Sequence, residues 1–172
     1  MRLIAPHVGF EKSYNDYIAE LGDEERYPFP MDLPHKDFKH LVELLTDFSH
    51  GKRLFSKMVT NSTFWLVDDD EIIAVSHLRH VLNDSLRHMG GHIGLGVRPS
   101  YRGKGVSKKL LKLTMQEAKK RDIDKLHIHC YKNNLASVNM IKACGGLLDT
   151  ELHSDEGNTE SPIVQKYILK EF

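Results

Sequence analysis

A glycine-rich turn between residues 94 and 107 is the part of the chain best suited to hold a negatively charged ligand. It joins a predicted strand to a long predicted helix and reads Gly94-Leu95-Gly96-Val97-Arg98-Pro99-Ser100-Tyr101-Arg102-Gly103-Lys104-Gly105-Val106-Ser107. Gly103 and Gly105 allow the backbone to approach a ligand closely. The first amides of a helix lack intrahelical partners, and the helix dipole adds partial positive charge there. The segment therefore predicts an anion site, with phosphate as its natural ligand.

Two common phosphate-binding motifs do not fit this turn. In a Walker A loop that ends on Gly103-Lys104, Arg98 would stand at the first glycine and Gly105 at the required Ser/Thr. In a dinucleotide-binding fingerprint, Lys108 would stand at the third glycine. The turn is therefore predicted to belong to another class of phosphate-binding motif.

Eleven histidines raise the alternative of a metal site. His127 and His129 alternate along a predicted strand and so share one face, with Cys130 on the other. Four further histidines could lie on neighbouring segments, namely His77, His80, His88 and His92. No compact zinc spacing with paired cysteines is visible in the sequence, so we expect no metal. Nothing in the sequence indicates a lowered pKa for Cys130, so we interpret it and Cys144 as small core residues.

Elements that could position the turn follow from the hydrophobic pattern. Residues 1–60 are predicted to be mostly helical, with helices over 11–21 and about 38–48 separated by a segment that three prolines interrupt. Residues 61–172 are predicted to form the sheet and the ligand-binding core. The strands are expected over 63–67, 72–78, 92–97, 125–131, 147–153 and 163–169, and the helices over 103–121 and 135–144. This order predicts one α/β domain over 1–172, a mixed sheet with helices on both faces.

Composition limits the class of protein. The 172 residues carry 24 lysines and arginines and 24 aspartates and glutamates, so no bulk positive charge is available to bind nucleic acid. No apolar stretch is long enough to cross a bilayer, and the amino-terminal residues lack an apolar segment of signal-peptide length. Only two cysteines are present. We therefore expect a cytoplasmic protein without membrane or nucleic-acid partners.

Two blocks resemble the GNAT superfamily of acetyl-CoA-dependent N-acetyltransferases. The pyrophosphate loop of that family, Gln/Arg-x-x-Gly-x-Gly/Ala, is matched by Arg102-x-x-Gly105-x-Ser107, with serine in the last position. The segment 133–146 resembles the family's Asn-x-x-Ala/Ser segment, which closes on Gly-Phe or Gly-Gly. The resemblance covers at least residues 72–169, and shorter phrases resemble a bacterial branch of largely unassigned substrate.

The resemblance implies a fold, a cofactor and a binding site. It implies a central, mostly antiparallel sheet of about six to seven strands, with strands splayed at the cofactor site, and acetyl-CoA as the acyl donor. The strand residues Leu95, Gly96 and Val97 would pair with the pantetheine arm, and a free amide near Leu95 would stabilise the oxyanion. Asn134 and Ser137 would form the opposite wall. The backbone amides that would hold the pyrophosphate are those of Arg102, Gly103, Lys104, Gly105, Val106 and Ser107.

The sequence offers more than one candidate for the general acid and the general base of the reaction. An alkylammonium acceptor has a pKa of about 10.4 and must lose a proton before it attacks. His92 lies close to the expected splayed strand, where it is either this base or a packing residue. Many relatives carry a proton-donating tyrosine seven residues after the helix-start asparagine, but Ile141 occupies that position here. Tyr131 or Tyr101 could substitute, or the thiolate could leave unaided.

The resulting prediction is an enzyme, an N-acetyltransferase that acts by direct attack in a ternary complex. The expected acceptor is a small-molecule amine, with a peptide or protein amine as a weaker alternative. A catalytically weak or inactive acyl-CoA sensor is the main rival, and a homodimer is compatible with the sequence. Acceptor specificity is expected from the amino-terminal helices, from residues 27–34 and from the loop after Leu78, where Arg79 or His80 could meet a carboxylate.

Overall fold

The computed structural model describes residues 1–155 and 157–170, so Glu156, Glu171 and Phe172 of the expected domain lie outside the described part. The strands are β1 (Arg2–Ile4), β2 (Asn61–Asp68), β3 (Glu71–Arg79), β4 (Ile93–Val97), β5 (Lys125–Tyr131), β6 (Leu147–His153) and β7 (Ile163–Lys170). The α-helices are α1 (Glu11–Leu21), α2 (Phe38–Ser49), α3 (Asp84–His88), α4 (Val106–Lys119) and α5 (Leu135–Ala143). Short 3-10 helices occupy Val8–Phe10, Phe29–Asp32 and Pro99–Tyr101.

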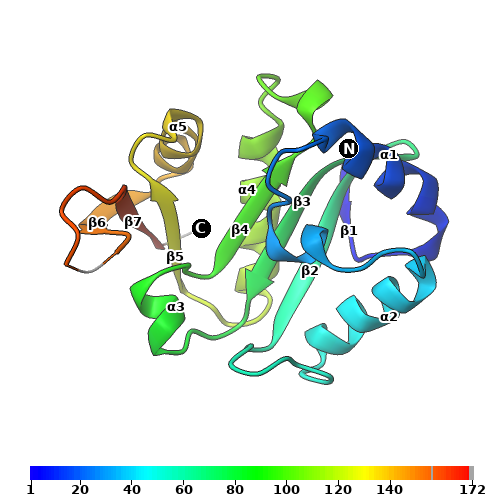
Figure 1. Ribbon diagram of the computed structural model, residues 1–172, viewed down its shortest axis with the longest axis horizontal. Coiled ribbons are helices and arrows are strands. Elements are labelled where there is room, and N and C mark those ends of the chain that lie inside the picture. Colours follow the sequence, from blue (N-terminus) through cyan, green and yellow to red (C-terminus); the bar gives the residue numbers. More distant parts are fainter. Residues whose placement is uncertain (156, 171–172) are drawn as a thin grey trace.

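The strands form two antiparallel sheets that meet at one point. One sheet has the order β1-β2-β3-β4 and the other the order β5-β7-β6. Strands β4 and β5 diverge from a shared end (Figure 1), where a single β-bridge joins Gly91 and Ile128. The described part of the chain holds seven strands, in agreement with the six to seven expected, but they form two sheets that separate between β4 and β5.

The four-stranded sheet is covered on both faces, as its alternating side chains require. On one face, Trp65 of β2 packs with Tyr14 of α1 and Phe38 of α2 in a buried cluster. The next residue, Leu66, points to the other face and packs with Val106 and its neighbours on α4. The ribbon places α1 and α2 on one side of the sheet and α4 on the other (Figure 1).

A second core joins the two sheets through α4 and α5. Leu111 and Ala118 of α4 lie in one buried cluster with Ile141 of α5 and with Ile128 and Tyr167 of the second sheet. Helix α4 therefore packs on both sheets, and it fixes the end of β4 relative to β5.

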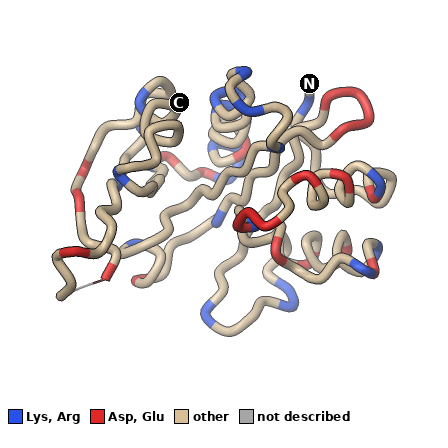
Figure 2. The backbone as a smooth tube through the Cα atoms, turned by 45° about the horizontal axis from the view of Figure 1, so that its top comes forward, with Lys and Arg blue, Asp and Glu red and all other residues tan. Residues whose placement is uncertain are grey.

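Two elements differ from the expected organisation. Residues 1–60 include one strand that was not expected, because β1 pairs antiparallel with β2 in the register Leu3↔Leu66. The amino group of Met1 is 3.0 Å from Asp68 Oδ1, beside the acidic turn after β2 (Figure 2). Helix α3, capped by the Asn83 side chain, was not expected either.

Within the described residues, no helix is long and apolar enough to cross a membrane.

Candidate active site

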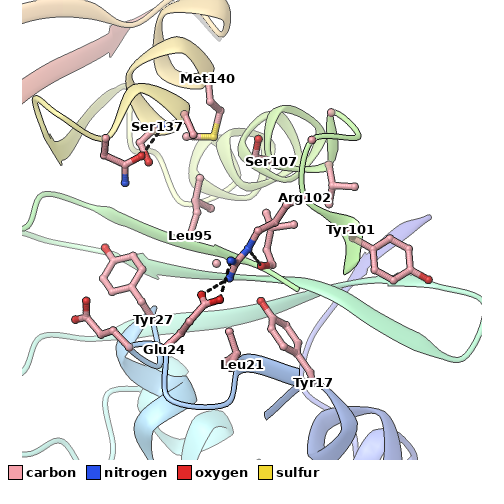
Figure 3. Close-up of a pocket in the computed structure, with 18 residues that line it drawn as sticks. Tyr17, Leu21, Glu24, Tyr27, Leu95, Tyr101, Arg102, Ser107, Ser137 and Met140 are labelled. Atoms are coloured by element: carbon pink, nitrogen blue, oxygen red, sulfur yellow. Dashed lines mark hydrogen bonds and ion pairs between the residues drawn. The ribbon is translucent and has the colours of Figure 1, made fainter. Parts of the chain in front are cut away.

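A cavity of about 700 Å³ lies between α1, the β4–α4 turn and α5. Its volume is in the range of small-molecule sites. Figure 3 shows that its walls come from segments far apart in the sequence, with Tyr17 and Leu21 on one side and Ser137 and Met140 on the other. Ten of the expected cofactor-binding residues line it: Leu95, Gly96, Val97, Arg102, Gly103, Gly105, Val106, Ser107, Asn134 and Ser137.

The β4–α4 turn presents an uncapped helix N-terminus to this cavity. Gly103 and Gly105 have φ values of +74° and +76°, which favour glycine over residues with a side chain. Gly105 is the N-cap of α4, no side chain caps the helix, and its first turn holds no acidic residue. The amides at the start of α4 are therefore available to a ligand, and the dipole favours an anion.

The two arginines of the turn are both paired with glutamates. The Arg102 guanidinium donates to both Glu24 oxygens, at 3.1 and 2.7 Å, and its Nε donates to the Val97 carbonyl oxygen at 3.1 Å (Figure 3). Arg98 Nε donates to Glu20 Oε2 at 2.5 Å, which ties β4 to α1. Hydrogen bonding to Arg102 lowers the pKa of Glu24 below its ordinary value. The positive charge of the turn is thus partly neutralised from α1 and the segment after it.

The free edge of β4 faces the gap between the sheets. The Arg98 N–H donates to the Ile73 carbonyl, and the His92 carbonyl accepts from the Arg79 N–H. The backbone groups of the even-numbered residues in this segment therefore point toward β3. Because backbone groups alternate in direction along a strand, those of Leu95 and Val97 point toward β5. Strand β5 diverges there, so these groups are open to the cavity that both residues line.

The opposite wall is the start of α5. Asn134 is the N-cap of this helix, and its Oδ1 accepts from the Ser137 N–H at 3.1 Å. The Nδ2 amide of Asn134 is thus the donor that this side chain can offer to a ligand. Ile141, on the same helix, is 1% exposed and lies in the core, and it is not one of the residues that line the cavity.

Tyr27 is a cavity residue that sequence reasoning placed only in a general specificity segment. A Cβ on Gly96 would lie 2.2 Å from the Tyr27 carbonyl oxygen, and one on Gly94 would lie 2.8 Å from the Tyr27 hydroxyl. The segment after α1 therefore lies directly on β4. The glycines at alternate positions of β4 are the signal that could have indicated this approach.

Two histidines hold β4 and β5 together at the base of the gap. His92 Nδ1 accepts the His127 N–H at 3.0 Å, and the His92 N–H donates to the His127 carbonyl at 2.7 Å. His129 Nδ1 accepts the Gly90 N–H at 2.9 Å. Burial lowers the pKa of both His92 and His129 to about 4. His92 is 7% exposed and is absent from the cavity lining.

Of the remaining predicted residues, Tyr101 lines the cavity, whereas Tyr131 and Lys104 lie outside its lining. Tyr131 is 51% exposed at the end of β5. The Lys104 ammonium lies 5.2 Å from the ring centre of Tyr101, and the Tyr101 hydroxyl donates a hydrogen bond to the Glu71 carboxylate. Burial raises the pKa of Cys130 to about 11, which disfavours the thiolate that a nucleophile needs. Among the described residues, no three His, Cys, Asp or Glu side chains are grouped so that they could hold a metal ion.

The sequence profile of the acetyltransferase (GNAT) family matches residues 18–145, which includes both blocks of the cavity wall. The chain belongs to this family. As a GNAT acetyltransferase it is a transferase. No protein of curated function matches the chain in sequence.

Solved structures confirm the GNAT fold at low sequence identity. Ribosomal-protein-S5-alanine acetyltransferase from Vibrio fischeri superposes with a TM-score of 0.70 at 14% identity, over 98% of this chain and 91% of that one. A spermidine N-acetyltransferase variant from Vibrio cholerae gives a TM-score of 0.66 at 16% identity, over 99% and 95%. A putative acetyltransferase from Salmonella typhimurium, solved with its cofactor acetyl-CoA, gives 0.65 at 13% identity, over 98% and 92%.

Proposed function

We propose that this GNAT protein transfers an acetyl group from acetyl-CoA to a primary amine on a small molecule, by direct attack in a ternary complex. The observation that carries the proposal is the cavity itself, which brings an uncapped helix N-terminus and an open strand edge together. The first feature suits a pyrophosphate and the second suits an amide-containing arm. In the reaction the ammonium first loses one proton, the amine nitrogen then bonds to the acetyl carbon, and the carbon–sulfur bond breaks. The second proton leaves the nitrogen as the amide forms, and the departing thiolate takes up a proton to give the free thiol.

Residues of this chain are well placed to hold acetyl-CoA, the acyl donor. The amides of residues 103–107, with Arg102, would hold the pyrophosphate, and Asn134 Nδ2 would donate from the opposite wall. The open backbone groups of Leu95 and Val97 would pair with the pantetheine arm. The N–H near Leu95 would stabilise negative charge that develops on the carbonyl oxygen, because it is a fixed donor in a partly enclosed site.

The residues expected to transfer protons are His92 and Tyr131. His92 as general base has to act with a pKa of about 4, so it would be a weak base at neutral pH. Tyr131 as general acid would have to reach the gap from an exposed position at the end of β5. A thiol pKa near 8.5 makes the thiolate an acceptable leaving group without a donor. His92→Ala distinguishes the two roles considered for His92. If His92 is the general base, the substitution changes the pH–rate profile of the enzyme. If His92 is a packing residue, the profile is unchanged and the free energy of unfolding is lower.

An acyl-CoA sensor is the second candidate function. It is favoured by the buried Ile141 and by the low pKa of His92, which leave no strong acid or base among the residues assigned to catalysis. A protein or peptide acceptor is a further option within the same chemistry, since the Vibrio fischeri neighbour is named for a ribosomal protein.

A thiol-release assay with acetyl-CoA and a panel of amines tests the proposal, together with calorimetric titration of acetyl-CoA. We expect acetyl-CoA to bind and thiol release to depend on an added small amine. Binding without release on any amine would favour the sensor. Release only with peptides would favour a protein acceptor, and an absence of binding would overturn the site assignment.

A further inference from the structure

A second hollow of about 270 Å³ opens on the α1–α2 side of the first sheet, next to the proposed acetyl-transfer cavity. Its lining includes His77 and Arg79 of β3 together with Phe29, Phe55, Lys57 and Asn61. His77 pairs in the ladder with Gly94, whose neighbours Leu95 and Gly96 line the first cavity. Tyr27 lies at the boundary, because it lines the first cavity while Phe29, two residues later, lines the second.

Arg79 is a half-buried cation without a carboxylate partner in the described part of the chain. Its Nη1 donates only to backbone carbonyls, those of Gly91 at 3.0 Å and Gly90 at 3.4 Å. Burial lowers the pKa of Arg79, and the nearby Tyr27 phenol opposes that shift. Lys57 is a second cation of the lining, and none of the described residues that form this lining is acidic. An anionic group is therefore the complementary ligand.

His77 adds an unsatisfied polar group to the same wall. Its side chain is 3% exposed, and neither ring nitrogen has a hydrogen-bond partner within the described residues. Buried polar atoms without partners are uncommon in folded proteins and cost free energy. Burial lowers the pKa of His77 to about 3, so the imidazole is neutral and offers one N–H donor.

The rest of the hollow is apolar and aromatic. Phe29 and Phe55 meet edge to face with ring centres 6.5 Å apart, and Phe29 also lies 6.2 Å from the His77 ring. The two phenylalanines remain 38% and 47% exposed, which is high for aromatic side chains that pack together. An apolar group of the ligand would cover this exposed surface.

We propose that the hollow is the acceptor subsite and that it selects a primary amine that also carries a carboxylate and an apolar side group, as an amino acid does. The inference rests on the proposed acetyl transfer. The carboxylate is held by the Arg79 guanidinium and hydrogen-bonded by His77, and the side group packs on Phe29 and Phe55. The amine points past Tyr27 toward Leu95 of β4. A polyamine does not fit, because its charges repel Arg79 and Lys57.

The experiment compares kcat/KM in the thiol-release assay for L-phenylalanine, L-phenylalaninamide, phenethylamine, glycine and spermidine. We expect phenylalanine to exceed the amide and phenethylamine by about 10- to 100-fold, the range for hydrogen bonds to charged groups. Glycine, without an apolar group, is expected to be poor. Equal rates for phenylalanine and phenethylamine, or a preference for spermidine, would overturn the subsite and leave the acetyltransferase proposal standing.

Variants separate recognition from folding. Arg79→Gln is expected to lower kcat/KM for phenylalanine about 10- to 100-fold more than kcat/KM for phenethylamine, so that the preference for phenylalanine is lost. Arg53→Gln is the control, since Arg53 pairs with Asp47 on the surface. Calorimetric titration with acetyl-CoA checks that Arg79→Gln retains the first cavity. A variant that loses activity equally on both amines would overturn the assignment of Arg79 to the carboxylate.

A binding measurement keeps the subsite testable if no amine is acetylated. Ligand-observed NMR with L-phenylalanine and phenethylamine reports occupancy without turnover. Phenylalanine binding that Arg79→Gln abolishes would support the subsite even where acetyl transfer fails. No binding of phenylalanine, in a protein that binds acetyl-CoA, would overturn it.

Discussion

Arg102 holds Glu24 with both terminal guanidinium nitrogens, at 3.1 and 2.7 Å, across the cavity proposed for the acyl donor. The same guanidinium lines the cavity beside the glycine turn that would take a pyrophosphate. Glu24 therefore competes with that anion for Arg102. The pair is about half exposed, so the competition is expected to be weak.

Glu24→Gln is expected to tighten acetyl-CoA binding by a few-fold, because it frees Arg102 and removes a negative charge from the cavity wall. The measurement is the calorimetric dissociation constant at low and at high salt, and the gain should shrink as salt rises. Glu43→Gln, which alters a surface pair with Lys39, is the matched control. Weaker binding in Glu24→Gln would mean that Glu24 positions Arg102 for the ligand.

Ser107→Asp is expected to weaken acetyl-CoA binding by roughly tenfold or more without loss of stability. An aspartate in the first turn of α4 suits the helix dipole but repels a phosphate at the same amides. Ser107→Asn has nearly the same shape without the charge, so its affinity should stay close to that of the parent. Thermal unfolding of both variants checks the fold. Equal affinities for the two variants would contradict the anion site.

Gly96→Ala is expected to displace the segment that carries Tyr27, since its Cβ would lie 2.2 Å from a backbone oxygen. Overpacking of this kind lowers the free energy of unfolding by about 1–3 kcal/mol. Trypsin should cleave after Arg26 faster than in the parent. Gly103→Ala is the control, because its added Cβ meets open space although the positive φ is strained. Trypsin should cleave this variant after Arg26 at the rate of the parent. Slow cleavage in both variants would show that the segment does not rest on β4.

The free energy of unfolding is expected to fall as pH drops from about 6.5 toward 4. His77, His92 and His129 are neutral in the fold, with pKa values of about 3, 4 and 4, whereas an unfolded histidine titrates near 6.5. The unfolded chain binds more protons in this window, so each imidazole contributes at most about 1.4 kcal/mol per pH unit.

Urea unfolding at several pH values measures this slope. The carboxylates with lowered pKa values, such as Glu20 and Glu117, lose their contribution only below about pH 4.5, so the window above that reports the histidines. His92→Asn retains an oxygen acceptor for the His127 N–H but cannot be protonated. Its slope should be smaller by one imidazole's share, and an unchanged slope would contradict the assignment.

Long elements with a clear period could be predicted from the sequence. The apolar stripe of Tyr14, Tyr17, Ile18 and Leu21 predicted a helix over 11–21, and α1 has these bounds. Strand β1 has three residues and α3 has five, which is too short for a hydrophobic period to emerge. Strand β1 exists because β2 offers it a paired edge, and that depends on tertiary structure.

The glycine turn was predictable because one continuous segment supplies most of it. The far wall was not, since Tyr17 and Leu21 belong to a stripe that periodicity assigns to the core. Both side chains are nearly buried, at 1% and 6% exposure, and yet they line the cavity. His92 shows the converse: proximity to β4 in the sequence suggested a catalytic base, whereas its ring nitrogen is occupied by a backbone amide of β5.

The paired imidazole contacts of His92 and His129 have a geometric consequence. Each ring nitrogen, in place of a backbone carbonyl, accepts an amide N–H of the facing segment, and the two contacts flank the Gly91–Ile128 bridge from which β4 and β5 diverge. A ligand anchored by its charged end at the start of α4 would extend along β4 toward this closed end. Its length would then determine which of its atoms lies beside Tyr27 and the proposed acceptor subsite.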